Sequence, residues 1–305
     1  MLLSETDQND SDVVSEKVKY RTRKGYVAFW LSICPGMGQQ YAGHLYRGIA
    51  AYAGLVSISW LSAIVYMYVD SRYIGLTILA LPFLSAFVIS ADAVICALKQ
   101  RQDYRLKWYN RYWLYLLVFA FLVFTVNPLM DAIVGRHIVR AFFVTSESMS
   151  PTILLHDLVV INKLATPKKG SVVLIDFAEQ AKDGAISSII HNQTLRRIVA
   201  VEGDEVEMRG ERVYINGELQ EEPYFSRGDS VSPNAFMNEG YRWGPKKVKK
   251  GEFFVLSDAR QYTFDSRMFG VISGSNIKGV ATKVFWSWNL NEGKFKWERT
   301  AMNIL

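Results

Sequence analysis

Cysteine is scarce in this 305-residue chain. Its two cysteines, Cys34 and Cys96, both fall inside apolar segments. A small secreted domain held together by disulfides has more cysteines, at regular spacings outside such segments. The sequence therefore excludes a disulfide framework, and the two thiols say nothing about the compartment of the rest of the chain.

Acidic residues are scarce between residues 26 and 134. The only four are Asp70, Asp92, Asp103 and Asp131. A membrane-spanning helix needs about 20 mostly apolar residues, and three stretches satisfy this requirement: 48–69, 73–98 and 112–134. Residues 26–137 are therefore expected to form a membrane module, which makes the lipid bilayer a partner of the chain.

Lysine and arginine are concentrated in residues 17–24 and 99–111, which lie beside the first and third predicted spans. Basic loops stay on the cytoplasmic side, and their charges contact anionic headgroups there. Three crossings from a cytoplasmic N-terminus leave everything after residue 134 outside the cytoplasm. The formal net charge of +6 is thus explained by membrane topology, and no nucleic-acid partner is expected.

A fourth apolar stretch, residues 26–43, would reverse this topology if it spanned the membrane. It contains Pro35, Gly36, Gly38 and two glutamines, so we expect an interfacial or re-entrant segment on the cytoplasmic side. The run PGMGQQYAGHLYRG resembles the opening of small two-span membrane modules, and a plain tight turn between apolar helices is the alternative. Residues 1–25 are interpreted as a disordered cytoplasmic tail, without a cleavable secretion signal.

Residues 138–305 have the pattern of a β domain. Short runs rich in β-branched residues alternate with turn signals, among them the Asn216-Gly217 pair that suits a tight hairpin. The predicted strands are 158–162, 171–177, 195–201, 212–215, 252–256 and 280–286. Strands at this spacing predict a mainly-β barrel or coiled sheet system, for which no helices are needed.

A serine-rich segment, FFVTSESMSPTILLHDLVVINK, follows the third predicted span at residues 142–163. Ser148 is followed by Met149 and then by Pro151 and Thr152. A serine becomes a nucleophile only when a base lies within hydrogen-bonding reach, so on its own this segment is a loop.

Four further motifs follow Ser146-x-Ser148-Met149-x-Pro151-Thr152 in order: Lys169-Gly170-Ser171-Val172-Val173; Arg196-Arg197-Ile198-Val199-Ala200-Val201-Glu202-Gly203-Asp204; Ser257-Asp258-Ala259-Arg260; and Asp265-Ser266-Arg267. Together they resemble the type I signal peptidase family, a Ser/Lys-type serine peptidase fold, over about residues 146–288. The resemblance implies a serine endopeptidase that removes N-terminal signal peptides from exported preproteins. It also implies a bacterial cytoplasmic membrane location with an extracytoplasmic C-terminal domain, and neither a cofactor nor a metal.

Matched positions carry implied roles. Ser148 would be the nucleophile, and Ser146 with the backbone N–H of Ser148 would face the oxyanion of the intermediate. Thr263 stands where the family commonly has a hydroxyl beside the base. Asp265 and Arg267 resemble the ion pair that braces the site.

The base position departs from the family. Bacterial members have a lysine there that loses its proton in an apolar pocket, whereas this chain has Arg196. A guanidinium has an ordinary pKa above about 12 and offers only donors, so Arg196 cannot simply inherit the role. Ser257 and Ala259 also replace the family's glycine and asparagine.

Three explanations remain open for Arg196. Another residue, for which His156, Lys163 and His191 are the candidates, serves as base; the chain is an impaired or inactive homologue that binds signal peptides or membrane partners; or the alignment slips locally. A slip is disfavoured because a shift by one residue would reverse every side chain across the strand.

Overall fold

The computed structural model describes residues 23–100, 108–177, 193–226, 240–262, 264–289 and 293–304. The chain divides into two compact units. The first, here the helical unit, comprises the described parts of residues 1–62 and 79–129. The second, the β unit, comprises those of residues 63–78 and 130–305. The predicted tail is mostly outside the described residues, as are most basic residues of the two predicted cytoplasmic segments.

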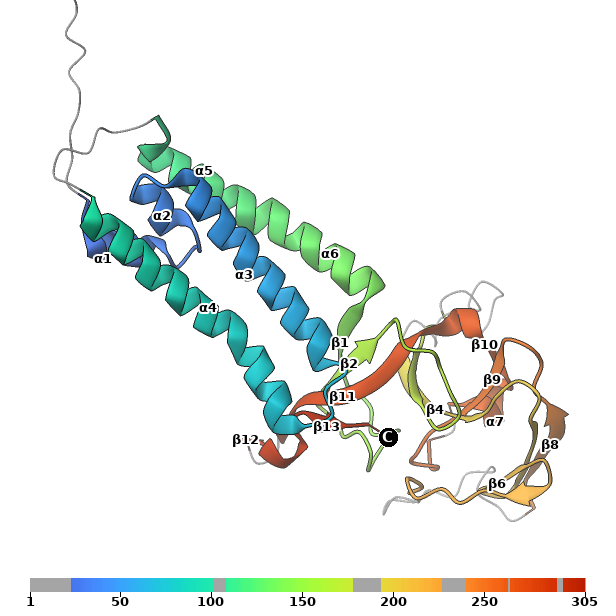
Figure 1. Ribbon diagram of the computed structural model, residues 1–305. Helices are drawn as coiled ribbons and strands as arrows, with labels where there is room; N and C mark the ends of the chain where they lie inside the picture. Colours follow the sequence, from blue (N-terminus) through green and yellow to red (C-terminus); the bar gives the residue numbers. More distant parts are fainter. Residues whose placement is uncertain are drawn as a thin grey trace, which may run out of the picture. The chain divides into compact units, whose positions relative to one another are not determined.

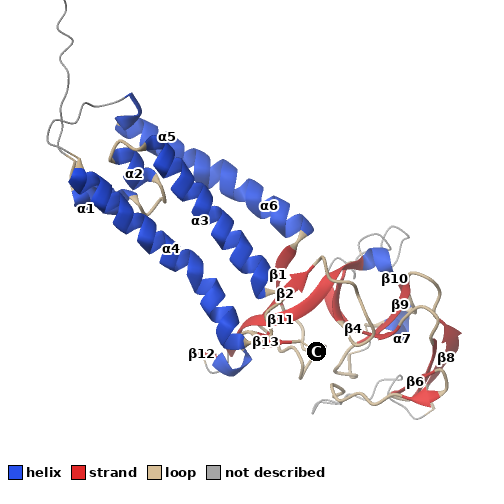
Figure 2. Ribbon diagram, in the orientation of Figure 1, coloured by secondary structure: helices blue, strands red, loops and turns tan. Residues whose placement is uncertain are grey.

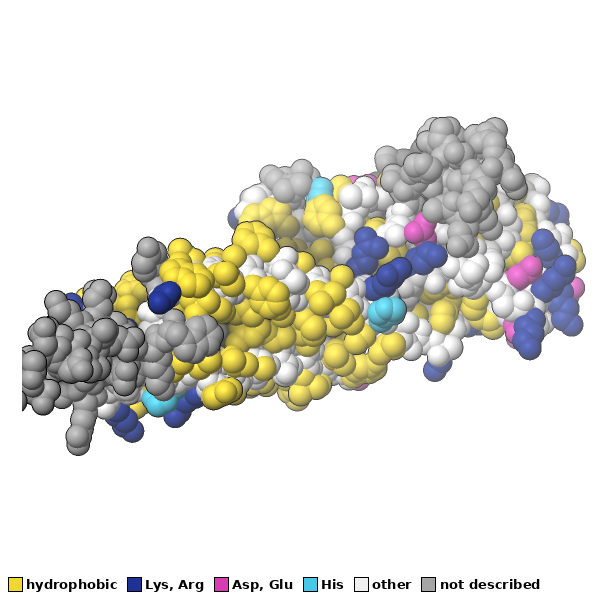
Figure 3. Space-filling model, turned by 90° about the horizontal axis from the view of Figure 1, so that it is seen from above, with side chains coloured by type: hydrophobic (Ala, Val, Ile, Leu, Met, Phe, Trp, Pro, Cys, Tyr) yellow, Lys and Arg dark blue, Asp and Glu magenta, His cyan; other side chains and the backbone are white. Residues whose placement is uncertain are grey.

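Helices make up the N-terminal part of the chain (Figures 1 and 2). They are α1 (Gly25–Leu31), α2 (Met37–Tyr41), α3 (Leu45–Tyr66), α4 (Arg72–Lys99), η1 (Trp108–Asn110), α5 (Tyr112–Phe121), η2 (Leu122–Val126) and α6 (Asn127–His137). Three helical stretches are long and apolar enough to cross a membrane: Leu45–Tyr66, Arg72–Lys99 and Trp113–His137. Hydrophobic side chains cover much of the helical surface in view in Figure 3, as expected of helices whose solvent is lipid.

The segment between residues 26 and 43 is helical but broken. Helices α1 and α2 have 7 and 5 residues, and neither is long enough to span a bilayer. The break lies at Gly36, whose φ of 91° favours glycine and whose missing Cβ would collide with the carbonyl of Gly48.

Polar side chains in the helical unit find partners within it. Gln39 of α2 donates from Nε2 to the carbonyl of Ile89 at 2.7 Å and to Asp92 Oδ2 at 3.2 Å. Arg47 of α3 pairs with the same Asp92 of α4. Polar groups at membrane depth need such internal partners, and the two glutamines of the motif thus belong to helix packing.

Strands make up the rest of the chain. They are β1 (Val139–Phe143), β2 (Asp157–Asn162), β3 (Val172–Ile175), β4 (Thr194–Ala200), β5 (Glu205–Arg209), β6 (Arg212–Ile215), β7 (Glu218–Leu219), β8 (Arg242–Lys247), β9 (Glu252–Leu256), β10 (Ile272–Ser273), β11 (Ile277–Asn289), β12 (Lys294–Phe295) and β13 (Met302–Asn303). The larger sheet has the order β1-β2-β11-β3-β4-β9-β10, with β12 and β13 paired to β11, and the smaller has the order β7-β6-β5-β8. The mainly-β fold predicted for this part of the chain is confirmed.

Each of the six predicted runs contains a strand, and Asn216 and Gly217 form the predicted turn with φ of 54° and 85°. Strands β1, β5 and β8 were not predicted, because charged residues interrupt them and the Gly244-Pro245 pair of β8 usually marks a turn. The expectation that no helix is needed is wrong for three short helices among the described residues. Two are 3-10 helices, η5 (Gly274–Asn276) and η6 (Trp297–Arg299). The third, the single turn α7 (Ser266–Phe269), follows Asp265, whose carboxylate accepts from the N–H of Arg267.

The apolar core of the larger sheet anchors the serine segment. Met149 and Ile153 are 1% and 0% exposed and pack in one cluster with Val159 and Ile161 of β2 and Leu174 of β3. Burying a side chain of this size contributes about 1.5–3 kcal/mol. The backbone around Ser148 is therefore held by the core on its C-terminal side.

The loop between α3 and α4 belongs to the β unit and packs on its sheet. Lys283 of β11 donates to the carbonyl of Val69, and Arg72 donates to the carbonyl of Trp297 at 2.6 Å. Asn303 of β13 donates to Asp70 at 3.3 Å. This loop and the β strands therefore lie on one side of any membrane that α3 and α4 cross.

Candidate active site

Ser148 lies in the turn between β1 and β2 and is 3% exposed. Its carbonyl accepts from the N–H of Ala259 at 3.1 Å. The serine is thereby fixed on both sides, by the apolar core through Met149 and by the segment after β9 through Ala259.

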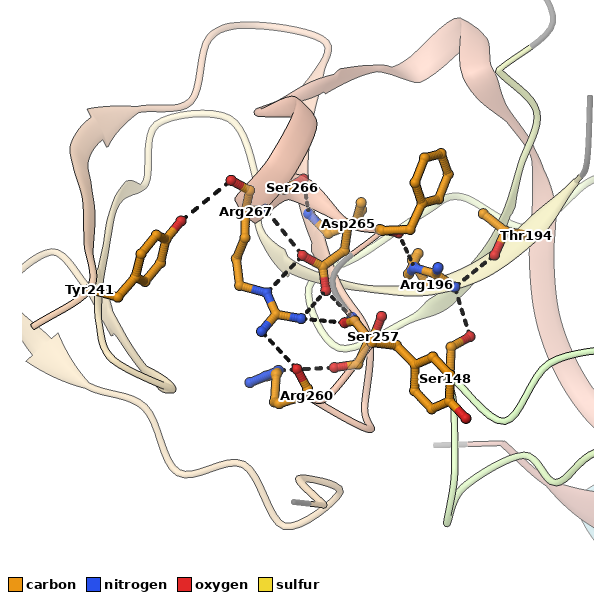
Figure 4. A network of polar contacts seen from close by, with 12 residues as sticks. Ser148, Thr194, Arg196, Tyr241, Ser257, Arg260, Asp265, Ser266 and Arg267 are labelled. Carbon is orange, nitrogen blue, oxygen red and sulfur yellow. Dashed lines mark hydrogen bonds and ion pairs between the residues drawn. The ribbon is translucent and has the colours of Figure 1, made fainter. Parts of the chain in front are cut away.

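Arg196 lies directly beside Ser148 (Figure 4). It belongs to β4, which pairs with β3 and β9 in the interior of the larger sheet, and it is 3% exposed. Its Nη1 donates to Ser148 Oγ at 2.9 Å and to Thr194 Oγ1 at 2.7 Å, and also to the carbonyl of Leu195. Its Nε donates to the carbonyl of Phe264 at 2.9 Å.

Burial lowers the pKa of Arg196 to about 10, because the charged form loses its hydration, although Asp265 partly opposes the change. Arg196 thus remains protonated at neutral pH. In that state it donates to the serine hydroxyl and has no lone pair with which to accept its proton.

Ser146 lies where an oxyanion donor is expected. Its Oγ is 3.2 Å from the backbone nitrogen of Ser148, which donates to it, and the side chain is exposed. The Ser146 hydroxyl and the N–H of Ser148 are therefore in direct contact.

Asp265 and Arg267 form a buried, bidentate ion pair. Arg267 Nη2 lies 2.7 Å from Asp265 Oδ2, and Nε lies 2.9 Å from Oδ1. Burial on its own would raise the pKa of Asp265, but hydrogen bonds from Arg267 and from the backbone N–H of Ser257 hold it below its ordinary value. Arg267 also donates to the carbonyls of Arg260 and Tyr262, so the pair ties α7 to the segment that precedes it.

Two further buried pairs adjoin it. Arg197 binds Asp258 in a bidentate pair with contacts of 2.8 and 2.7 Å, and it stacks on the ring of Tyr224 with 4.0 Å to the centroid. Arg260 pairs with Glu222 at 2.5 Å. The three pairs Arg197–Asp258, Arg260–Glu222 and Arg267–Asp265 are called the ion-pair cluster below.

Two of the three substitute bases named from the sequence, His156 and Lys163, make their contacts with residues other than Ser148. His156 contacts the ring of Phe143 at 5.8 Å, and Lys163 donates to the carbonyl of Arg136 at 3.2 Å. Within the part of the chain that the structure describes, neither hydrogen-bonds to Ser148. His191 and Thr263 lie outside the described residues.

Sequence reasoning missed two parts of this arrangement. Thr194 lies two residues before Arg196 on the same strand face, so strand periodicity could have identified it. Nothing in the sequence pointed to Glu222, which lies between β7 and β8 of the smaller sheet and reaches Arg260 only through the fold. No cluster of three or more His, Cys, Asp or Glu side chains suited to a metal ion is found among the described residues.

Comparison with known proteins gives consistent matches. A sequence profile described as signal peptidase, peptidase S26, matches residues 111–286. Signal peptidase I from Leptolyngbya laminosa is 31% identical over 179 residues, which cover 53% of this chain and 82% of the relative. Signal peptidase IB from Staphylococcus aureus strain Mu50 is 31% identical over 180 residues, covering 55% and 88%.

A solved structure of signal peptidase I from Enterococcus faecalis V583 also matches, with 24% sequence identity and a TM-score of 0.28. It covers 39% of this chain and 98% of that one. The profile spans more than half of the chain and includes both Ser148 and Arg196, and the relatives are covered over most of their length. The chain therefore belongs to the signal peptidase family, peptidase S26.

Proposed function

We propose that the chain is a membrane-bound serine endopeptidase that removes N-terminal signal peptides from exported preproteins. The observation that carries the proposal is the 2.9 Å contact between Ser148 Oγ and the residue at the base position, Arg196 Nη1. The residues at the family's nucleophile and base positions thus lie within hydrogen-bonding distance in this chain, which is the separation that serine activation requires once the base has lost its proton.

In this mechanism Ser148 attacks the scissile carbonyl and forms an ester with the signal peptide, and the ester is then hydrolysed by water. The negative charge that develops on the carbonyl oxygen is stabilised by Ser146 and by the N–H of Ser148. That oxygen takes the place of Ser146 Oγ as acceptor for the N–H, which the exposure of Ser146 permits. The pair Asp265–Arg267 holds the loop that carries Phe264, whose carbonyl orients Arg196.

Removal of the hydroxyl proton of Ser148 by Arg196 is expected to limit the rate. With a pKa of about 10, Arg196 is neutral in about one molecule in a thousand at pH 7. Its neutral form can accept the proton of Ser148, so the enzyme is slow at neutral pH and faster in alkali.

The site faces outward from a bacterial cytoplasmic membrane. Two observations support this topology: basic residues lie at the ends of the helices that are predicted to be cytoplasmic, and the loop between α3 and α4 packs against β11 and β13. Protease added outside spheroplasts should cut the β unit and spare the N-terminal tail. The reverse pattern would contradict the proposed topology.

The activity is tested with the full-length protein in detergent. It should be incubated with a preprotein at pH 7 and pH 9, and the cleavage site should be read by mass spectrometry. The proposal expects one cut after the signal peptide and a faster rate at pH 9. Absence of any cut at both values would refute it.

A second function is favoured by one observation, the donation from Arg196 to Ser148 Oγ, which occupies the serine with a donor. If Arg196 always donates to Ser148 Oγ and never accepts the proton of the serine, the chain would bind signal peptides without cleaving them. Uncut preprotein that remains bound to the purified chain at both pH values would favour this second function over the first.

A further inference from the structure

The charges around Ser148 do not balance. The β unit buries four arginines among the residues that the structure describes: Arg196, Arg197, Arg260 and Arg267. Three of them are paired with carboxylates in the ion-pair cluster. Among the described residues, the fourth, Arg196, donates only to neutral acceptors, which are two hydroxyls and two carbonyls.

An uncompensated charge in a protein interior costs several kcal/mol. The nearest carboxylates, Asp258 and Asp265, are each held by another arginine, so they offset only part of the charge of Arg196. The base position of this chain therefore has an unmet requirement for an anion. A neutral lysine, as the family has there, creates no such requirement.

Donors converge on the same spot. Because Ser148 Oγ accepts from Arg196, its own hydrogen is free to be donated to a ligand. The N–H of Ser148 donates to Ser146 Oγ at 3.2 Å, and a ligand oxygen that replaces this acceptor can receive the N–H and the Ser146 hydroxyl. Nη2 of Arg196 has no hydrogen-bond partner within the described ranges. Two hydroxyls, one N–H and a cation behind them are the elements of a carboxylate receptor.

We propose that Arg196, Ser148 and Ser146 capture the free C-terminal carboxylate of a peptide that ends at Ser148, and that the released signal peptide is this ligand. The inference rests on the proposed function for the identity of the peptide. Hydrolysis of the ester on Ser148 leaves the new carboxylate next to Ser148 Oγ. An uncut preprotein presents a neutral amide at that place, so the site prefers product over substrate.

The preference is measured with two synthetic signal peptides of one sequence ending in alanine, one with a free carboxylate and one with a carboxamide. Each is titrated against the full-length protein in detergent at pH 7, with fluorescence anisotropy as readout. The parent should bind the acid at least tenfold more tightly, a difference of about 1.4 kcal/mol. Equal affinities would overturn the inference.

Two variants test whether Arg196 is the cause. Arg196→Gln should bring the acid-to-amide ratio close to one, whereas Arg212→Gln, which changes an exposed arginine of β6, should leave it unchanged. Since Arg196→Gln can fail to fold, Arg196→Lys is measured at pH 9. The buried lysine is then largely neutral and should lose the preference, while the parent retains it. A preference that persists in the lysine variant at pH 9 would overturn the assignment to Arg196.

This experiment separates the inference from the endopeptidase. A parent that cuts preprotein but binds acid and amide equally contradicts only the carboxylate site. A parent that never cuts but prefers the acid tenfold contradicts the endopeptidase and supports the carboxylate site.

Discussion

The ion-pair cluster and the Ser148 site both bury arginine in the β unit, but among the described residues only the cluster supplies carboxylates as partners. Arg197, Arg260 and Arg267 each meet an acid at 2.5–2.7 Å. Arg196, next in sequence to Arg197, meets Ser148 and Thr194 instead. Adjacent residues of one strand point to opposite faces, so the two arginines enter different environments.

This difference indicates that the ion-pair cluster stabilises the fold, whereas Arg196 acts on the chemistry of the Ser148 site. A buried cation that is paired and fully hydrogen-bonded braces the fold, and removing either partner leaves the other charge exposed to a poor solvent. A buried cation whose acceptors are all neutral does not form such a pair. It affects what the site can bind and which protons it can move, and substitutions in the two regions should therefore have different consequences.

The largest effect on activity is expected at Ser148. Ser148→Ala removes the attacking oxygen and should abolish cleavage of a preprotein. Arg196 keeps Thr194 and the carbonyl of Phe264 as acceptors, so the melting temperature should change little. Cleavage is followed by gel and mass spectrometry and stability by thermal unfolding. An alanine variant as fast as the parent would eliminate Ser148 as nucleophile.

The largest effect on stability is expected in the cluster. Arg267→Met strands the buried carboxylate of Asp265 and should cost about 3–5 kcal/mol, or roughly 6 °C or more in melting temperature. The matched control is Arg209→Met, which breaks an exposed pair with Glu207 and should leave the melting temperature nearly unchanged. Similar melting temperatures for both variants would remove the distinction between the two regions.

A smaller effect is expected at Ser146, which supplies one of two oxyanion donors. Ser146→Ala should slow cleavage by about 10²–10³-fold, equivalent to about 2.7–4 kcal/mol, with the N–H of Ser148 still in place. Thr145→Ala alters a neighbouring exposed hydroxyl and should keep the parent rate. If both alanine variants cleave at equal rates, Ser146 has no part in the reaction.

The sequence was sufficient for those features that depend on local pattern. Apolar length predicted the long helices, β-branched runs predicted six strands, and motif order related Ser148 to Arg196 and Asp265 to Arg267. It was insufficient where contacts come from distant segments. Glu222 reaches Arg260, and the loop around Val69 reaches Lys283 across 214 positions of sequence. That no carboxylate of the described residues pairs with Arg196 is likewise a property of the packed sheet, since a sequence lists acids without their distances.

The smallest expected effect concerns Arg196 itself, and it distinguishes a slow enzyme from a binder. Arg196→Lys should raise cleavage at pH 7 by tenfold or more, about 1.4 kcal/mol of barrier, because a buried lysine loses its proton more readily and can accept that of Ser148.

The dependence of the cleavage rate on pH tests whether Arg196 is the group that accepts the proton of Ser148, which a rate at one pH does not. The rate of the parent should rise about tenfold per unit between pH 7 and 9, since the pKa of Arg196 is lowered to about 10 and only its neutral form accepts a proton. The lysine variant should reach its plateau at lower pH, so the two profiles converge in alkali. A parent that is fast and independent of pH, and that Arg196→Lys slows, would mean that Arg196 positions Ser148 while another group takes the proton. His156, Lys163 and His191 would then be replaced next. His156 contacts Phe143 and Lys163 contacts the carbonyl of Arg136 in this structure, so a part for either of them would also require its segment to move before catalysis.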